Sequence, residues 1–489
     1  MDTPGDTSTI GICGPCHDRL PERTRFARVA RGRRRRWRAE PRARLAIPLY
    51  VACIHTDHSR RVRCSATLAI RSGESTVRKD SSTLAVRPRP GLDEVPAGRS
   101  GERKRKPSGP VGRTRLAAID GLRLVAAVAV AAFHYVGTTT PHFWGENDPR
   151  QFAPVLHEIS RYGWLGVEFF FMISGFVICM SCWGRTPVQF VVSRVSRLFP
   201  SYWCAVLLVV GLVLIARLGH FRAATPIDLR TVLGNLTMVP GPLGLQLIEG
   251  VAWTLWVEAR FYLLMAVMLF FGLTYRRMIA FCGTWLTLAI VARELDSAVL
   301  DEVFVSQYTG LFVTGMALYL MHRFGQNLVL WLLAGFAWCY ELTVLDDRVA
   351  AHAVRPAEGG ALSWAVCAAV LTFFLAVLAL AGFGPLARLR WRWLVTAGAL
   401  TYPFYLVHQS IGIPVAKGLL QKVPVLGVLP SMAVAAVFSL LLSAAIHYVV
   451  DGPLGRVLRH QLTRGMSPQQ RPAATTVRNQ GERTDLRKS

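Results

Sequence analysis

Apolar residues in this chain are grouped in long stretches between residues 111 and 458. Ten stretches of about twenty residues are separated by polar connections, and about twenty apolar residues are what a helix needs to cross a hydrocarbon core. They lie at 116–136, 163–183, 199–217, 250–272, 278–293, 304–322, 328–345, 361–383, 394–414 and 430–450. This pattern predicts an all-α polytopic integral membrane protein with about ten transmembrane helices.

The charges on the connections predict the orientation in the membrane. If the N-terminus is cytoplasmic, the inner connections hold Arg185, Arg194, Arg197, Arg276, Arg277, Arg323, Arg388, Arg390 and Arg392. The outer connection 294–302 is acidic, although Arg222, Arg230, Arg348 and Arg355 also fall outside. An excess of Lys and Arg marks the cytoplasmic side. We therefore expect a plasma-membrane protein with both termini in the cytoplasm.

Two of the outer connections, 137–162 and 218–249, are longer than a simple turn requires. Neither is long enough to form a separate domain. Long ordered loops usually carry a function. We expect these two to cover or shape a site on the outer side.

The composition agrees with a membrane domain at 111–458 and adds two basic ends. Of the 489 residues, 52% are hydrophobic and 18% are charged, with a net charge of +26. Residues 1–110 lack periodicity and are rich in Arg, Pro, Ser and Gly, which predicts a disordered basic segment. The alternative is a start site placed too far upstream, with the true beginning at Val111 or later. Residues 459–489 are predicted to be a disordered basic cytoplasmic tail.

The basic character does not indicate nucleic acid as a partner. Nucleic-acid-binding proteins carry basic patches, but the basic residues here lie mainly in the tails and in one set of connections. Six of the ten cysteines lie in apolar stretches, and the pair Cys13 and Cys16 has no second CxxC to complete a metal site. We expect a lipid bilayer as partner, no nucleic acid and no metal.

The first apolar stretch contains ionisable residues that a membrane helix normally excludes. Asp120 and Arg123 lie near its start and His134 near its end. A charged group at the membrane centre costs about 3 kcal/mol on the insertion scale, so such residues are functional candidates. Arg123 and His134 are close to three helical turns apart, roughly 16 Å, and point to the same side. This spacing suits a long anionic reagent.

Two further polar groups fall at the depth of His134. Glu258 lies about eight residues into its stretch from the outer side, and a nearby carboxylate orients an imidazole and keeps it basic, as a general base requires. The alternative is a structural buried hydrogen bond. His408, near Tyr405, is either a third member of this polar cluster or a helix-packing histidine.

Two short motifs allow a functional and a structural interpretation. Arg194 and Arg197 are three residues apart on one helical face, a spacing that suits the bidentate binding of phosphate but also anchoring to lipid headgroups. Ser174 and Gly175 form a small pair. We favour close helix packing as its role.

Together these segments resemble the acyltransferase 3 family of membrane acyltransferases, which includes O-acetyltransferases of bacterial surface polysaccharides and certain antibiotic acyltransferases. The resemblance covers about 116–458. The matching residues are Asp120 to Arg123 with His134, Phe170 to Gly175, Arg194 with Arg197, Trp253 to Tyr262 around Glu258, Thr401 to His408, and Asp451 with Pro453. The departures are Leu124, Ala259 and Ser410, which neighbour the polar groups.

The resemblance implies an acyl-CoA co-substrate, most often acetyl-CoA, no permanently bound cofactor, and an acceptor hydroxyl on a carbohydrate or glycosylated molecule. It implies that His134 and Glu258 are catalytic and that Arg123, Arg194 and Arg197 bind CoA on the cytoplasmic side. It gives Asp120, Ser174, Tyr405 and His408 supporting roles. His134 would either deprotonate the acceptor or form a covalent acyl-His intermediate.

Two other classes of function remain as alternatives. A membrane transporter or flippase of a glycolipid or small glycoside would use the same polar groups as a pathway, and would consume no acyl-CoA. A non-catalytic membrane scaffold or sensor would leave the cost of the buried titratable groups unexplained. No internal repeat of the transporter kind is visible.

Overall fold

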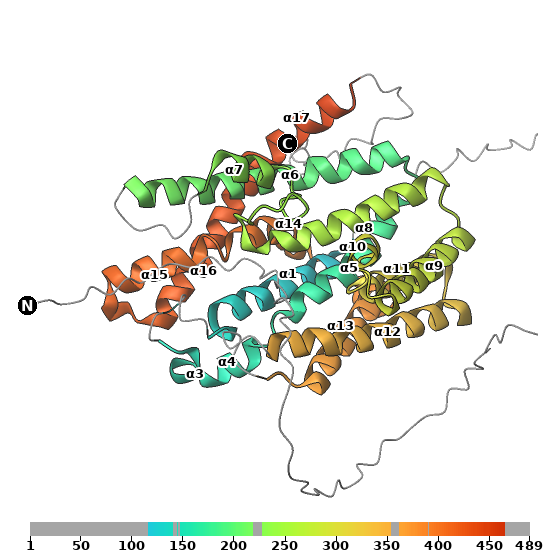
Figure 1. Ribbon diagram of the computed structural model, residues 1–489, viewed down its shortest axis with the longest axis horizontal. Coiled ribbons are helices and arrows are strands. Elements are labelled where there is room, and N and C mark those ends of the chain that lie inside the picture. Colours follow the sequence, from blue (N-terminus) through green and yellow to red (C-terminus); the bar gives the residue numbers. More distant parts are fainter. Residues whose placement is uncertain are drawn as a thin grey trace, which may run out of the picture. The chain divides into compact units, whose positions relative to one another are not determined.

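The computed structural model describes residues 116–139, 144, 147–218, 227–353, 361–389 and 391–464 (Figure 1). All of them belong to one compact unit. The predicted basic segment 1–110 lies outside the described residues. The predicted tail 459–489 lies outside them from residue 465 onward, and its residues 459–462 form the end of helix α17 (Gly452–Leu462).

The described residues form helices and contain no strand. In chain order they are α1 (Ala117–Ala132), η1 (Phe133–Gly137), α3 (Pro149–Phe152), α4 (Pro154–Ser160), α5 (Leu165–Cys182), α6 (Pro187–Leu218), α7 (Leu229–Leu236), η2 (Gly250–Ala252), α8 (Trp253–Phe270), α9 (Tyr275–Glu294), α10 (Ala298–Phe304), α11 (Thr309–Phe324), α12 (Leu328–Ala353), α13 (Trp364–Gly382), η4 (Pro385–Arg388), α14 (Arg392–Val407), α15 (Gly412–Lys422), η5 (Pro424–Leu426), α16 (Val428–Ala445), η6 (Ile446–Asp451) and α17 (Gly452–Leu462). Two of these, η1 and η6, are π-helical turns.

Each of the ten predicted membrane segments coincides with a helix. Within the described part of the chain, eight helical stretches are long and apolar enough to cross a membrane. They are Ala117–Gly137, Pro154–Cys182, Pro187–Ile215, Gly250–Phe270, Ala298–Phe324, Leu328–His352, Trp364–Gly382 and Val428–Leu462. The prediction of an all-α polytopic membrane protein is confirmed. The two predicted segments outside this set are α9, which has charged residues at both ends, and α14, which is only 16 residues long.

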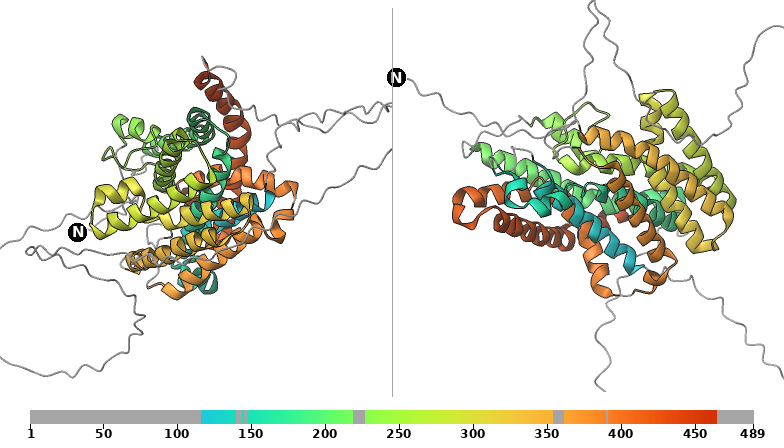
Figure 2. Two further views of the ribbon diagram at one scale, coloured as in Figure 1. Left: turned by 90° about the vertical axis from the view of Figure 1, so that its right-hand side faces the viewer. Right: turned by 90° about the horizontal axis from the view of Figure 1, so that it is seen from below.

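The centre of the fold is formed by α5 and α11, which pack with their backbones in close contact (Figures 1 and 2). A side chain at Gly175 would collide with the carbonyl of Phe312, and one at Gly315 would collide with the carbonyl of Met172. Small residues that allow this approach are typical of membrane helix interfaces. The packing role expected of the Ser174–Gly175 pair is therefore confirmed for Gly175.

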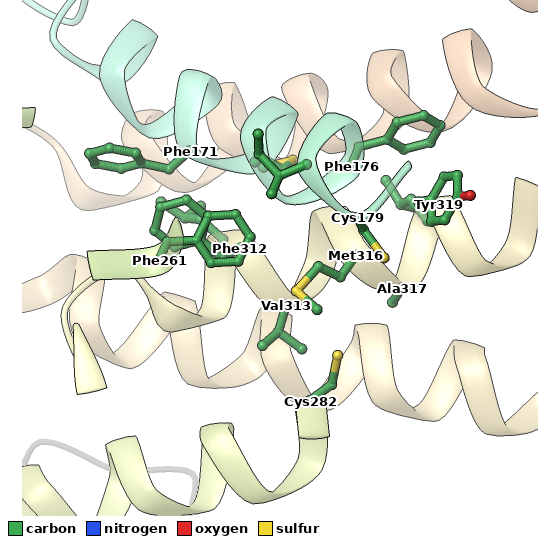
Figure 3. Packing of buried hydrophobic residues seen from close by; sticks show 14 of the residues in the cluster. Phe171, Phe176, Cys179, Phe261, Cys282, Phe312, Val313, Met316, Ala317 and Tyr319 are labelled. Carbon is green, nitrogen blue, oxygen red and sulfur yellow. The ribbon is translucent and has the colours of Figure 1, made fainter. Parts of the chain in front are cut away.

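Aromatic and sulfur-containing side chains fill the space around this contact (Figure 3). Phe261 of α8 stacks on Phe312 of α11, with ring centroids 4.3 Å apart, and Phe171 of α5 lies 5.2 Å from Phe312. Large aromatic side chains of this kind contribute much of the packing in a core. This cluster ties α8 to α5 and α11, and so fixes the helices that carry Glu258 and Ser174.

An ion-pair cluster is buried between α5 and α12. Arg348 Nε lies 3.1 Å from Glu168 Oε1, and a second nitrogen of Arg348 pairs with Glu341. The exposed fractions of the three residues are 7%, 2% and 0%. Arg348 was predicted to lie in an outer connection, and this was wrong, because α12 continues beyond it to Ala353. Pairing with two carboxylates compensates the burial of the charge.

Candidate active site

A pocket lies between α1, α5, α8 and α14. Its empty volume is about 480 Å³, including the part open to solvent. The lining residues are Arg123, Val167, Phe170, Phe171, Ser174, Thr254, Leu255, Glu258, Thr401, Tyr402 and Tyr405. The structure therefore brings Arg123, Ser174, Glu258 and Tyr405, all predicted from the sequence, to one cavity with otherwise mostly apolar and aromatic walls.

Three arginines gather beside this pocket. The guanidinium of Arg197 interacts electrostatically with Arg123 and Arg194, and also with Glu258. Arg194 and Arg197 lie on α6, whose helix begins twelve residues earlier than the predicted segment 199–217, and Arg197 is exposed. Three guanidiniums facing one carboxylate leave an excess of positive charge. Such a cluster suits a polyanionic ligand, because guanidinium binds phosphate oxygens in a bidentate manner.

Glu258 is fixed by a neighbour from another helix. The hydroxyl of Ser174 donates a 2.6 Å hydrogen bond to Glu258 Oε1 across the α5–α8 interface. Glu258 also interacts with Tyr262, one turn further along α8. Ser174 and Gly175 therefore make different contacts. Gly175 allows the close approach of α11, and Ser174 holds the carboxylate of Glu258 in the pocket.

His134 lies in the π-helical turn η1, directly after α1. Segments of this kind occur frequently at functional sites. The long connection that follows fixes the turn, since Trp144 Nε1 donates to the carbonyl of Tyr135 at 2.9 Å and the buried His157 donates from Nδ1 to the carbonyl of Val136 at 2.8 Å. The predicted loop 137–162 thus shapes the backbone that carries His134.

The nearest titratable neighbour of the His134 ring is His408. The two ring centroids are 5.3 Å apart. His408 Nδ1 lies 2.7 Å from the carbonyl of Tyr405, and the hydroxyl of Tyr135 donates to the carbonyl of His408 at 2.8 Å. Among the described residues His134 makes no hydrogen bond to Glu258. The orientation of His134 by Glu258 therefore stays a prediction.

The second long connection, 218–249, contributes a residue that sequence reasoning missed. Glu249 is completely buried, and its Oε1 accepts a 2.7 Å hydrogen bond from the hydroxyl of Ser410, two residues after His408. Burial raises the pKa of Glu249 to about 8, although the hydrogen bonds from Ser410 and from the backbone N–H of Val251 act in the opposite direction. The sequence feature that could have identified Glu249 is its position four residues before the matching stretch Trp253 to Tyr262.

Asp120 lies outside the pocket, and its supporting role stays a prediction. It lies in the first turn of α1 and is buried. A side chain at Gly398 of α14 would collide with it, so the two helices meet closely at this residue. No group of three or more potential metal ligands is found in the described part of the chain.

The family of this chain is shown by one family model that matches most of its length. A family model described as an acyltransferase domain matches residues 116–448, which is more than half of the chain. The chain belongs to the acyltransferase 3 family. As a member of the acyltransferase 3 family with eight membrane-compatible helical stretches in its described part, it is a multi-pass membrane protein. The acyltransferase domain contains every predicted site residue from Asp120 to His408.

A curated relative adds a biological context. The exopolysaccharide production protein ExoZ of Rhizobium meliloti is 32% identical to this chain over 166 residues. The match covers 32% of this chain and 49% of ExoZ, so it spans about half the length of that relative. No solved structure matches this chain significantly.

Proposed function

We propose that this acyltransferase moves an acyl group, most often acetyl, from acyl-CoA to a hydroxyl of a carbohydrate or glycosylated acceptor. The observation that carries this proposal is the cluster of Arg123, Arg194 and Arg197 at the pocket between α1, α5, α8 and α14. A cluster of cations and a titratable base suit a ligand that has an anionic end and a reactive end.

The length of α1 supports the same assignment. Arg123 and His134 are eleven residues apart, which corresponds to roughly 16 Å of helix. The pantetheine arm of CoA has a comparable length. With the CoA phosphates on the three arginines, the arm would pass through the pocket by Ser174 and Glu258, and the thioester would reach His134.

The chemistry needs one base and one positioned thioester. A ring nitrogen of His134 takes the proton of the acceptor hydroxyl while the hydroxyl oxygen attacks the thioester carbonyl. The carbon–sulfur bond then breaks, and the CoA thiolate takes the proton back from His134. The products are the acylated acceptor and free CoA. No cofactor other than the co-substrate enters this scheme.

The charge distribution supports a cytoplasmic donor and an acceptor that arrives at the opposite end of the pocket. Arg194 and Arg197 lie in the first part of α6, at the end of the helix that the positive-inside rule assigns to the cytoplasm. The printed name of the relative ExoZ, an exopolysaccharide production protein, favours a cell-envelope polysaccharide or its precursor as acceptor.

The experiment measures free thiol release from a panel of acyl-CoA chain lengths by the purified protein in detergent. Because water can replace the missing acceptor, we expect slow hydrolysis, with acetyl-CoA among the best donors. If no acyl-CoA is bound or turned over, the donor assignment is wrong and a transporter or flippase becomes the better explanation.

A further inference from the structure

His408 has one nitrogen whose role is clear and one whose role is not. Nδ1 faces the carbonyl oxygen of Tyr405 at 2.7 Å, and a carbonyl can only accept, so Nδ1 carries the proton. Nε2 is then the lone-pair nitrogen. His408 is completely buried, and its Nε2 has no hydrogen-bond partner among the described residues.

A buried nitrogen without a partner is exceptional, because nearly all buried polar atoms are hydrogen-bonded. A histidine that serves only in helix packing gains nothing from this arrangement, which an apolar side chain of similar size would avoid. A partner for Nε2 must therefore come from a neighbouring side chain. Of the titratable rings that lie beside the His408 ring, that of His134 is the nearest, at 5.3 Å between centroids.

The geometry matches two imidazoles joined by one N–H···N hydrogen bond. The ring centroids of His134 and His408 are 5.3 Å apart, and the ring planes are inclined by 45°. An N–H···N contact of about 3 Å between two facing ring edges needs about this separation of centres. The separation of the two rings is therefore compatible with such a contact.

Both backbones are tied together at this point. The hydroxyl of Tyr135, the residue after His134, donates to the carbonyl of His408. Gly412 makes room for that hydroxyl, because a side chain at Gly412 would collide with it. The turn that carries His134 is thus held against the end of α14 by a hydrogen bond from Tyr135, the neighbour of His134, to His408 itself.

We propose that His408 is the positioning residue of His134: its Nε2 accepts a hydrogen bond from one N–H of the His134 ring and so leaves the other ring nitrogen unprotonated and directed at the acceptor hydroxyl. When His134 takes the acceptor proton, both of its nitrogens carry hydrogen, and the imidazolium keeps its hydrogen bond to His408 Nε2. His408 itself exchanges no proton. A base that is oriented by a third group is the general arrangement of activated nucleophiles. This inference rests on the proposed function and assigns the orienting role that the sequence had suggested for Glu258.

Two substitutions separate the two nitrogens of His408. The amide of His408→Gln lies near the position of Nε2 and retains an acceptor there, whereas the amide of His408→Asn lies near Nδ1 and retains only the anchor to the Tyr405 carbonyl. We expect His408→Asn to lower kcat of acyl transfer by about 100-fold with little change in KM for acyl-CoA, and His408→Gln to lower it by less than about tenfold.

The opposite order of the two variants, or wild-type kcat in both, would overturn the inference. The same assay includes His134→Ala, and turnover that persists in that variant would instead overturn the proposed function. A second measurement does not depend on the folding of the His408 variants. In ¹⁵N-histidine-labelled wild-type protein, His134 should have one fixed tautomer at neutral pH, and rapid exchange between its tautomers would contradict the proposal.

Discussion

The replacement of Arg348 by Met tests how much the buried ion-pair cluster contributes to the stability of the fold. The guanidinium pairs with Glu168 at 3.1 Å, pairs with Glu341, donates to the backbone carbonyl of Gln307 and lies 5.3 Å from the ring centre of Tyr308. The substitution to Met keeps an unbranched apolar stem but removes the guanidinium group and with it all of these polar contacts. Two carboxylates would then remain buried without a cation.

The size of the effect follows from that uncompensated charge. Removal of one partner from a buried ion pair costs about 3–5 kcal/mol, because the desolvation of the remaining charge is no longer offset. At about 2–4 °C per kcal/mol for a large domain, the apparent Tm should fall by roughly 6–20 °C. Exposed ion pairs are worth far less, about 0–1 kcal/mol.

The cysteines of the chain provide the assay. Cys179, Cys182, Cys282 and Cys367 are free and buried, so a thiol-reactive fluorophore reports their exposure on heating, with the exposed Cys339 setting the baseline. The control is a triple variant that combines Arg348→Met with Glu168→Gln and Glu341→Gln.

The triple variant should regain at least half of the lost Tm, because the replacement of a whole buried ion-pair cluster by neutral groups is often tolerated. A wild-type Tm in the single variant, or a triple variant no more stable than the single one, would refute the reasoning.

Three further predictions concern the site and its support. Gly175→Ala should cost about 1–3 kcal/mol in the same melting assay, since the new methyl group meets a backbone carbonyl, whereas Gly211→Ala, which has open space, should be neutral or slightly stabilising. Ser174→Ala should lower kcat of acyl transfer by about tenfold at unchanged Tm, because Glu258 loses its 2.6 Å hydrogen bond; an unchanged kcat would remove this role. Arg197→Gln should raise KM for acyl-CoA by about tenfold or more, with kcat nearly unchanged, and equal KM values would argue against phosphate binding there.

The sequence was sufficient to locate the long apolar helices and four of the residues that line the pocket, namely Arg123, Ser174, Glu258 and Tyr405. Long apolar stretches have one stable solution in a bilayer, so each predicted segment is helical. Arg123 and Glu258 were identified because ionisable residues at membrane depth are exceptional. Ser174 was identified because it belongs to a motif that resembles the acyltransferase 3 family. That these residues line one pocket could not be derived from their spacing, since it depends on which helices are neighbours.

The errors have physical reasons as well. The hydropathy pattern excluded Arg348 from the membrane segment, because no single sequence shows that Glu168, 180 residues away, compensates the charge. The π-helical turn at His134 could not be read from periodicity, since one inserted residue leaves the apolar pattern nearly unchanged. The hydrogen bond from Ser174 to Glu258 could not be derived from the sequence either. Depth in the membrane had suggested His134 as the partner of Glu258, but depth does not show which helices are neighbours.

The central claim is that His134 is the base of an acyl-CoA-dependent transfer. The most direct measurement compares thiol release from acetyl-CoA by the wild-type protein and by His134→Ala, both purified in the same detergent and matched for apparent Tm. His460→Ala, a change at an exposed histidine of α17, is the matched control and should keep the wild-type rate. The account predicts that release falls by at least about 100-fold in His134→Ala alone. Wild-type release by a folded His134→Ala variant would contradict it.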